Sequence, residues 1–593
     1  MSGTGKYKAV IFVSVMKVSP EQFKLQTLTE QIDKGELRIP VFQRSYIWKK
    51  SQVRLLMDSI FHEYPTGALL FMSNSDELAS NWFENAPHNE EGIDYLVLDG
   101  QQRLTSCYHV LYDKAPNNRY FIKLDELFKE WKRTNGNKEE IDFDEKCIIT
   151  KPNKGKPPTS IVDYLLPFSY LRNPEKYSTI MAGYASGLPC STEEEKEFVK
   201  FIQINLLSLI SPFFNYQFYA MVLPKKLDLN AVCRVFETLN NSGTKLDTFD
   251  ICVAKFKRHG IEIKTDLENA IKNSDCLMPL FANNQNRELP LVVIALYTGA
   301  DHKKNSLAKL KSDYVRDYWG RSITALVKTI EILEATGAEP SKSLKFIPYM
   351  VAIPVIAAAL IKSGYIDGKL PKGRESLVDD IVHQYFFYTA LDMRYTEGTP
   401  SKMKEDVASL TDWIVNGNMM KQYTEGVEWN FDRVSSYQKN QNGAIPRAIK
   451  CVYNLASPQS FYNKARVDIH SEDTELHHIF PLDDYEGTPK IDSILNLVFQ
   501  PKSVNRSIGS ETTKKYIADI VKKRYSNETQ VREMMKSHLV DGDTYDSLVE
   551  ERYQDFIEER AEAICNVLEG RFNIKLKRVE IAIPDNDEQF EDN

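Results

Sequence analysis

The stretch Tyr95–Tyr112, YLVLDGQQRLTSCYHVLY, decides how the N-terminal part of the chain is expected to fold. Its apolar run ends abruptly at Asp99-Gly100. After that point apolar residues recur at helical spacing, which is typical of the buried face of a helix: Leu104, Cys107, Tyr108 and Leu111. The sequence therefore predicts a strand, then a turn that contains Asp-Gly-Gln-Gln-Arg, then a helix.

A turn of this composition has two interpretations. A helix N-terminus attracts phosphate, glycine lets a ligand approach the backbone, and arginine offers a bidentate fork. On this interpretation Gly100, Gln101, Gln102 and Arg103 bind a phosphorylated ligand, and Asp99 holds a cation or a water. On the other, Asp99 caps the helix and Arg103 makes a surface ion pair. The stretch alone leaves both open.

A second polar stretch lies upstream, within residues 39–60. Phe42-Gln43-Arg44 and Tyr46-x-Trp48 stand just before a predicted helix. Aromatic side chains interleaved with Gln and Arg can stack on bases or surround a modified group. The alternative is that these aromatic side chains belong only to the core.

The remaining pattern indicates several domains. A chain of 593 residues is too long for one core. Short apolar runs alternate with helical patterns over residues 21–125, which is typical of an α/β or α+β domain. Residues 265–450 are mainly helical in pattern. We expect a domain at 1–260, a helical linker domain at 261–450, a third domain at 451–580 and a disordered acidic tail at 581–593.

The bulk composition excludes some classes of protein. Formal net charge is −8, which argues against a uniformly basic nucleic-acid-binding surface but not against a local basic groove. No apolar run reaches the ~18 residues of a membrane span, so no membrane partner is expected. The eight cysteines include no CxxC pair, and a reducing cytoplasm is the predicted location.

The third region of interest is TELHHIFPLDDYEG, with its adjacent histidines. Asn496 and Asn505 follow, in a predicted order of strand, loop, strand and helix. Phosphodiester hydrolysis requires a base for water, a divalent cation and a fixed orientation of the base. Neighbouring strand residues point to opposite sides, so one histidine could face a metal and the other a phosphate. The alternative is one buried and one exposed structural histidine.

This segment resembles the HNH, or ββα-metal, nucleases over about residues 465–525. His477-His478-Ile479-Phe480-Pro481 fits a divergent first motif, Asn496-Leu497 the second and Asn505 the third. The resemblance implies that His478 is the general base, that His477 and Asn505 hold Mg²⁺ or Mn²⁺, and that Asn496 braces the loop and belongs to the catalytic set. Two features depart from the family: zinc-binding cysteine pairs are missing, and asparagine at 505 is a weaker metal ligand than histidine.

Local charge agrees with a nuclease. Residues 502–536 carry nine Lys or Arg against four Asp or Glu, within an acidic protein. Such a surface suits phosphate contacts, and the candidates for the DNA backbone are Arg506, Lys514 and Lys515. An ordinary solvated helix face is the alternative explanation of the charge.

The N-terminal stretches RIPVFQRSYIW, VLDGQQRLTS and VFETLNNSGTKLD together resemble the GmrSD and SspE restriction proteins, whose N-terminal fold is related to ParB and sulfiredoxin. The resemblance covers about residues 25–260. It implies a nucleotide site at Asp99, Gly100, Gln101, Gln102, Arg103, Asn240 and Gly243. It also implies DNA or modification sensing by Phe42, Gln43, Arg44, Tyr46 and Trp48. No Walker A loop is present, so an NTPase here would not be of the P-loop type.

The predicted fold is multidomain and mainly α with α+β parts: a ParB/sulfiredoxin-like domain, a helical middle and an HNH core within helices. The predicted function is a modification-dependent or phage-defence DNA endonuclease, regulated by binding and hydrolysis of GTP or another nucleoside triphosphate. The alternative is a ParB-like DNA-binding regulator with a non-catalytic C-terminal domain; cleavage of RNA is a subsidiary alternative. Expected partners are modified or phage DNA and a nucleotide, and a homodimer is one alternative for the assembly.

Overall fold

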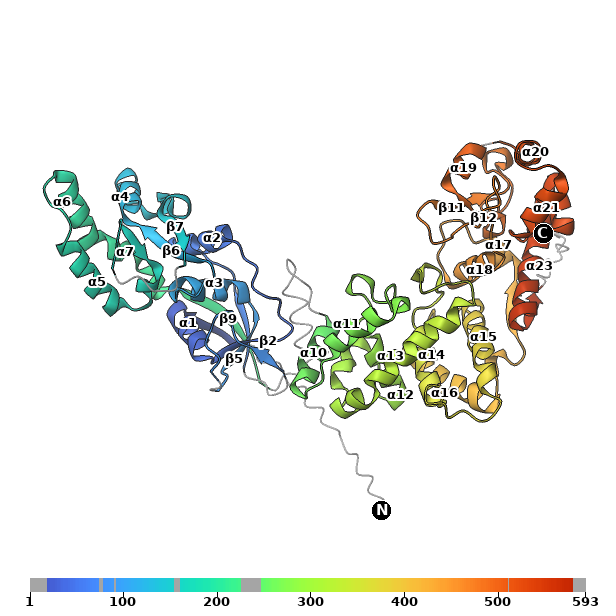
Figure 1. Ribbon diagram of the computed structural model, residues 1–593, viewed down its shortest axis with the longest axis horizontal. Helices are drawn as coiled ribbons and strands as arrows, with labels where there is room; N and C mark the ends of the chain where they lie inside the picture. The colour runs from blue at the N-terminus through green and yellow to red at the C-terminus, as the bar shows by residue number, and fades with distance from the viewer. Residues whose placement is uncertain are drawn as a thin grey trace, which may run out of the picture. The chain divides into compact units, whose positions relative to one another are not determined.

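The computed structural model of the protein describes residues 19–73, 78–89, 92–153, 160–225, 247–509 and 511–579. The chain divides into two compact units, Met1–Gly260 and Ile261–Asn593 (Figure 1). Helices predominate, and several small sheets accompany them, so the expectation of a multidomain protein with α and α+β parts is confirmed. The boundary predicted at 450 falls inside helix α18, Ala444–Leu455.

A six-stranded mixed sheet forms one end of the first unit, in the order β1-β9-β3-β5-β2-β4. β1 pairs with β9, β3 with β5 and β2 with β4 in antiparallel fashion, whereas β9 with β3 and β5 with β2 are parallel. The strands are β1 Ser19–Lys24, β2 Leu37–Pro40, β3 Leu69–Ser73, β4 Ser80–Asn81, β5 Tyr95–Asp99 and β9 Gln217–Leu223.

The predicted strand-turn-helix unit is confirmed. β5 ends at Asp99 and α3, Gln101–Leu111, begins two residues later. α3 packs on α1, Leu25–Lys34, and on α2, Lys50–Phe61. The three helices bury a continuous apolar core against the sheet. α10, Thr248–Arg258, closes the unit, and the side chain of Asp247 caps this helix by accepting from the Asp250 amide.

The other end of the unit is a three-stranded antiparallel sheet, β7-β6-β8, with helices beside it (Figure 1). The polar stretch of residues 136–160, with its clustered Lys, Gly and Pro, predicts an exposed excursion, but Phe143 and Cys147 are fully buried and residues 148–152 form β7. The elements are β6 Asn118–Lys123, β7 Ile148–Pro152, β8 Leu165–Pro167, α4 Leu124–Arg133, α5 Pro174–Ser186, α6 Glu193–Lys200, α7 Leu206–Ile210 and α8 Pro212–Asn215.

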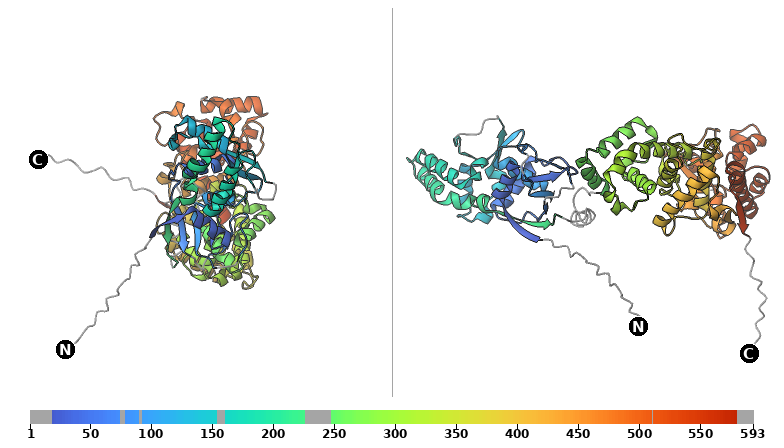
Figure 2. Two further views of the ribbon diagram at one scale, coloured as in Figure 1. Left: turned by 90° about the vertical axis from the view of Figure 1, so that its left-hand side faces the viewer. Right: turned by 90° about the horizontal axis from the view of Figure 1, so that it is seen from below.

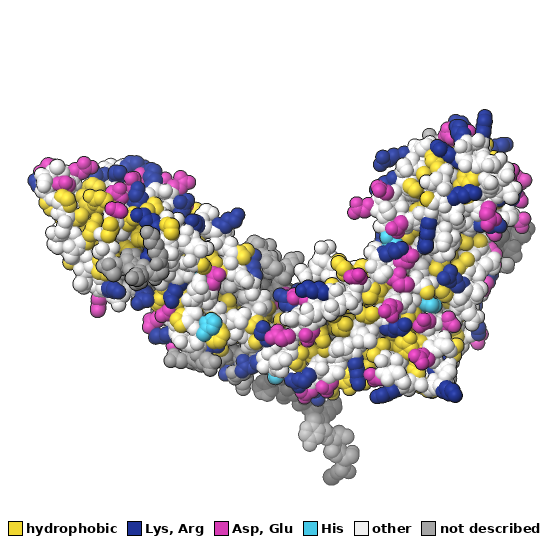
Figure 3. All heavy atoms as spheres, in the orientation of Figure 1, with side chains coloured by type: hydrophobic (Ala, Val, Ile, Leu, Met, Phe, Trp, Pro, Cys, Tyr) yellow, Lys and Arg dark blue, Asp and Glu magenta, His cyan; other side chains and the backbone are white. Residues whose placement is uncertain are grey.

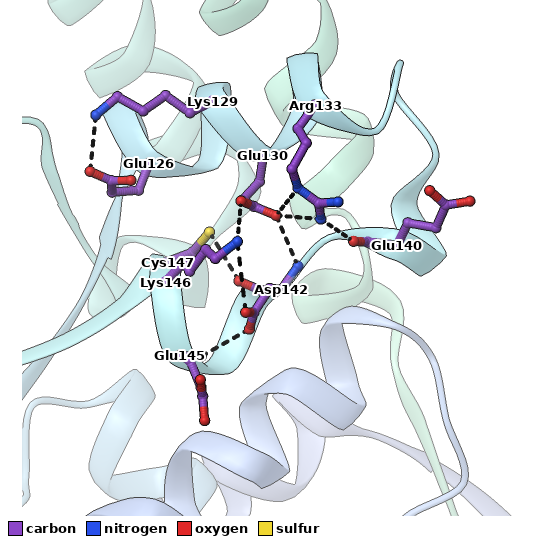
Figure 4. Close-up of polar contacts among 9 residues, drawn as sticks. All are labelled: Glu126, Lys129, Glu130, Arg133, Glu140, Asp142, Glu145, Lys146 and Cys147. Atoms are coloured by element: carbon purple, nitrogen blue, oxygen red, sulfur yellow. Dashed lines mark hydrogen bonds and ion pairs between the residues drawn. The ribbon is translucent and has the colours of Figure 1, made fainter.

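A buried carboxylate ties α4 to the turn before β7 (Figure 4). Glu130 accepts hydrogen bonds from Arg133 at 2.6 Å and from Lys146 at 2.7 Å. These partners, Arg133 first, lower the pKa of Glu130 to about 2. Arg133 and Lys146 are therefore both used in joining α4 to the turn before β7, and we assign this cluster a structural role.

The stretch Glu193–Asn215 is the one candidate membrane span found in the described part of the chain, by length and composition alone. The sequence expectation was that no stretch would qualify. A single helix of this kind is weak support for a membrane span, because core helices of globular proteins pass the same test.

The second unit begins with a layer of long helices, several of them nearly all buried. α12, α13 and α14 pack on one another, and α14 also packs on α16. The predominantly helical character expected for residues 265–450 is confirmed. The helices are α11 Ile263–Asn273, α12 Leu289–Thr298, α13 Ser312–Glu334, α14 Ala352–Lys362, α15 Val378–Leu391, α16 Thr399–Asn416, α17 Phe431–Ser435 and α18 Ala444–Leu455.

The C-terminal part of the second unit contains an antiparallel pair, β11-β12, followed by helices that gather at one end of the unit (Figure 2). The predicted order of strand, loop, strand and helix is confirmed. The helix that directly follows the second strand is short, α19 Lys502–Ile508, and the longer α20 Thr513–Arg524 comes after it. The elements are β11 Thr474–His478, β12 Leu497–Pro501, α19 Lys502–Ile508, α20 Thr513–Arg524, α21 Glu528–Lys536, α22 Gly542–Val549 and α23 Tyr553–Phe572, with a parallel pair β10 Val427–Asn430 and β13 Leu576–Val579.

Candidate functional site

The two histidines end β11, the first strand of the hairpin. His477 pairs with Val498 and His478 with Leu497 across the two strands. His477 is 4% exposed, and the His478 side chain is 14% exposed. Because successive strand residues face opposite ways, the two imidazoles reach different surroundings.

His477 faces a helix residue that the sequence singled out. Its Nδ1 lies 2.5 Å from Oδ1 of Asn505 on α19. Nδ2 of Asn505 donates to Glu475, which lies two residues before His477 and on the same face of the strand. Three metal-ligand types, an imidazole, an amide oxygen and a carboxylate, are thus joined by direct contacts.

The environment of His477 keeps it neutral. Burial lowers the pKa of His477 to about 4, although the contact with Asn505 raises it. Its Nε2 is buried without a hydrogen-bond partner in the described part of the chain, and the rings of Phe461 and Tyr516 lie edge-on to the imidazole. A neutral imidazole is the form that binds a metal.

His478 contacts a loop carboxylate instead. Its Nε2 lies 2.6 Å from Oδ1 of Asp492, whose side chain is 35% exposed. Burial lowers the pKa of His478, and the hydrogen bond with Asp492 opposes this shift. A histidine that is neutral and only partly buried can accept a proton from a water molecule.

Asn496 joins the two ends of the loop between the strands. It is fully buried, its Oδ1 accepts from the Phe480 backbone at 2.9 Å, and its Nδ2 donates to Phe480 and Ile491 carbonyls. On either side, the carbonyls of Leu495 and Leu497 accept hydrogen bonds from the buried Arg560. Asn496 therefore ties the two ends of the loop together, and Arg560 holds the same segment in a way that the sequence did not indicate.

A lysine also lies near the two histidines. Its segment runs beside the loop, because Gln438 forms a β-bridge with Ser493 and the Ile494 amide donates to the Tyr437 carbonyl. The charge of Lys439, the next residue, lowers the pKa of both His477 and His478. A cation beside the histidines suits a phosphate ligand.

The Asp-Gly-Gln-Gln-Arg turn of the first unit is built differently. Gly100, with φ of 98°, is the N-cap residue of α3, so Asp99 does not cap the helix. A Cβ at Gly100 would lie 2.2 Å from Cδ2 of Leu69, and only glycine fits. Arg103 donates to the carbonyls of Thr66, Gly67 and Ala68 and pairs with Asp99 at 3.1 Å.

The two polar stretches of the first unit are bonded to each other. Oε1 of Gln102 accepts from the Ile47 amide and Nε2 donates to the Ser45 carbonyl, while Gln43 donates to the carbonyl of Leu98 in β5. The hydroxyl groups of Tyr46 and Ser106 lie 2.9 Å apart. Gln101 is 5% exposed at the start of the helix. The structure brings both stretches together as one packed unit.

The other predicted residues of the first unit are exposed or partly buried, or they lie outside the described residues. Arg44 is exposed, Phe42 and Trp48 are partly buried, and Asp99 is 43% exposed. Asn240 and Gly243 lie outside the described residues.

The predicted DNA-backbone residues lie on α19 and α20, where Lys and Arg side chains project (Figure 3). Arg506, Lys514 and Lys515 are all exposed. Lys515 pairs with Glu511 at 3.0 Å.

Three residues of the C-terminal cluster escaped the sequence prediction: Glu475, Asp492 and Lys439. The period-two spacing of Glu475 and His477 on one strand was a usable signal. The other two are brought in by loops. In the described residues no group of three or more His, Cys, Asp or Glu side chains has metal-binding geometry, so any metal here depends on Asn505.

Comparison with known proteins supports part of this description. Residues 25–257 match the family described as GmrSD restriction endonuclease, N-terminal domain, so the first unit resembles that family. The chain is also 22% identical over 606 residues to the uncharacterized protein MJ0686 of Methanocaldococcus jannaschii, a match that covers 93% of this chain and 98% of that protein. The first likeness is to a domain of restriction endonucleases, and the second extends over nearly the whole chain.

Proposed function

We propose that this protein is a metal-dependent DNA endonuclease of phage defence, with an HNH-type cleavage site in its C-terminal part. The observation that carries the proposal is that the two adjacent histidines at the end of β11 contact different groups. His477 contacts Asn505, which in turn contacts Glu475, whereas the imidazole of the next residue, His478, is hydrogen-bonded to Asp492. One set has the chemistry of a cation site and the other that of a general base.

The first set fits a divalent cation. Asn505 Oδ1, the Glu475 carboxylate and neutral His477 would hold it, with the histidine binding through Nδ1 in the tautomer that carries its proton on Nε2. Oxygen ligands with an imidazole suit Mg²⁺ or Mn²⁺. When bound, the cation would supply neutralisation of the scissile phosphate and of the leaving oxygen.

The second set performs the proton transfer. His478 accepts a proton from a water molecule, whose oxygen forms a bond to phosphorus while the bond from phosphorus to the 3′-oxygen breaks. The 3′-oxygen leaves with the electron pair and is protonated by solvent. Asn496 keeps the loop in place, Lys439 attracts the phosphate, and Arg506, Lys514 and Lys515 contact the DNA backbone.

We also propose that the first unit regulates DNA cleavage by binding a nucleotide, in keeping with its likeness to the GmrSD N-terminal domain. We place a nucleotide, GTP or another triphosphate, at the N-terminus of α3 beside Asp99, Gly100 and Gln101, with Gln102 and Arg103 maintaining the turn. Arg44, Phe42 and Trp48 then face DNA or its modified base, with Gln43 and Tyr46 holding their loop. Binding of a fluorescent GTP to wild type but not to Asp99→Ala would support this placement; equal binding would contradict it.

Plasmid cleavage tests the proposal. Wild type and His478→Ala are incubated with Mg²⁺ or Mn²⁺ on plain and phage-modified DNA, with and without GTP. His88→Ala serves as the control, because His88 is an exposed histidine of the other unit. We expect nicking that His478→Ala reduces by about 10³-fold and His88→Ala leaves unchanged. If wild type cuts no substrate, the ParB-like DNA-binding regulator becomes the better explanation.

A further inference from the structure

The carboxylate of Asp492 has no role in the mechanism described so far. Its Oδ1 lies 2.6 Å from Nε2 of His478, within hydrogen-bond distance. Asp492 lies 14 residues further along the chain, in the loop between the two strands of the hairpin. The contact is therefore made by the fold of the loop and not by sequence neighbourhood.

This contact selects one form of the imidazole. An ionised carboxylate only accepts hydrogen bonds, so the ring nitrogen that faces it must carry the proton. The neutral ring then has its proton on Nε2 and its lone pair on Nδ1. His478 Nδ1 has no hydrogen-bond partner among the described residues, so that lone pair is available to a water molecule.

The loop holds Asp492 firmly on both sides. The carbonyl of Ile491 accepts from Asn496 at 2.9 Å, and Ser493 forms the β-bridge with Gln438. The carbonyl of Lys490 accepts from the Tyr553 hydroxyl at 2.6 Å. A carboxylate fixed by its neighbours can orient an imidazole without moving itself.

We propose that Asp492 is a positioning residue for His478: it fixes the ring with Nε2–H toward the loop and Nδ1 toward the attacking water. The inference rests on the proposed nuclease function and assigns a specific partner to its base. Asp492 itself contacts neither DNA nor the reacting atoms. A carboxylate that holds a histidine in one tautomer is a general device of acid–base catalysis.

The test compares Asp492→Asn with Asp432→Asn. Asp432 pairs with Lys490 of the same loop, so its loss perturbs the loop without touching His478. We expect Asp492→Asn to lower kcat for nicking by about 10- to 100-fold, with KM for DNA and the Mn²⁺ requirement unchanged. In the His478→Ala background the same substitution should have no further effect, because the two residues act as a unit.

A second readout follows the ring itself and does not need cleavage. In ¹⁵N-histidine-labelled full-length protein, the signals that vanish in His478→Ala identify this residue among the ten histidines. The ¹⁵N shifts should report Nε2–H in wild type and in Asp432→Asn, and a mixture of tautomers in Asp492→Asn.

The outcomes separate the two proposals. Wild-type turnover and tautomer in Asp492→Asn, while His478→Ala is inactive, would overturn the role of Asp492 and leave the nuclease intact. Equal losses in Asp492→Asn and Asp432→Asn would also overturn it, since loop integrity would then explain the effect. Absence of cleavage by wild type would overturn the nuclease, and with it a catalytic role for Asp492.

Discussion

The two polar motifs of this chain use similar residue types in opposite ways. In the first unit, Arg103 is bonded to three backbone carbonyls and Gln102 to the backbone of the preceding loop. In the second unit, His477, His478 and Asn505 contact other side chains, and these are ligand or acid–base groups. The first motif mainly holds its own chain together, whereas the second joins imidazole, amide and carboxylate groups to one another.

The difference shows why a polar motif cannot be assigned from residue types alone. A side chain whose donors are all used by backbone carbonyls stabilises the fold, and its loss should lower the free energy of unfolding. A side chain that contacts metal-ligand or acid–base groups should, on the proposed function, change activity when it is lost, in addition to any cost in stability.

The largest expected effect is on the metal requirement of the C-terminal site. Asn505→Ala removes an oxygen that contacts His477, so the Mn²⁺ concentration for half-maximal nicking should rise by about 100-fold or more. The substitution should also cost about 1 to 3 kcal/mol of stability, because the buried Nδ1 of His477 is left without its partner. Titration of nicking against Mn²⁺ measures the shift.

Asn527→Ala is the matched control for this experiment. Asn527 caps α21 in the same unit, so its loss should cost about 1 kcal/mol of stability without altering the Mn²⁺ titration. An Asn505→Ala protein with a normal Mn²⁺ requirement and a lowered melting temperature would place Asn505 with the structural residues instead.

The second prediction concerns Arg103. Arg103→Met keeps the length of the side chain but removes its bonds to Thr66, Gly67 and Ala68, so the first unit should lose about 2 to 3 kcal/mol of stability. Hydrogen exchange of peptides from α3 should accelerate accordingly, while peptides from β11 and β12 keep the wild-type rate. Unchanged exchange in α3 together with lost nucleotide binding would instead make Arg103 a ligand residue.

The sequence predicts the secondary structure of both motifs but not which groups their polar side chains contact. The strand, turn and helix of residues 95–111 and the hairpin with its histidines follow from apolar periodicity and are confirmed by the structure. Whether Gln102 faces a ligand or the Ser45 carbonyl depends on how a loop 57 residues away folds back, which local pattern does not encode. Asp492 was missed for the same reason, because its turn is an irregular loop.

The polar segment before β7 gives a second example. Residues 136–147 belong to the polar stretch that predicts an exposed excursion, yet Ile141, Phe143 and Cys147 are buried. Arg54 and Asp144 form an ion pair at 3.1 Å, and Glu130 is bonded to Arg133 and Lys146. Charged residues that pair with one another let a polar sequence cover a core, and average composition does not reveal this.

The third prediction is a pH effect in the first unit. Burial lowers the pKa of His109, on α3, to about 4, and its Nε2 lies 3.0 Å from the Glu84 carbonyl. The unfolded chain takes up a proton near pH 6.5 and the folded one does not, so stability is full above pH 6.5 and falls as pH drops toward 4. About 2 kcal/mol should be lost between pH 7.5 and 5.

Hydrogen exchange of α3 at the two pH values, corrected for intrinsic rates, measures this loss. His109→Gln should remove most of the pH dependence, because glutamine does not titrate. A pH dependence that persists unchanged in His109→Gln would mean that another group of the unit is responsible.

The smallest effect is expected at the basic surface of α19 and α20. Arg506 is exposed, whereas Lys515 is paired with Glu511 at 3.0 Å and must exchange this partner for a phosphate. Arg506→Ala should therefore reduce the salt dependence of DNA binding by about one phosphate contact, and Lys515→Ala by less.

Glu511→Gln should strengthen binding slightly in wild type but not in Lys515→Ala, since it acts by releasing this lysine. Fluorescence anisotropy over a range of KCl concentrations measures all three, and a Glu511→Gln effect that survives Lys515→Ala would show that the carboxylate repels DNA directly.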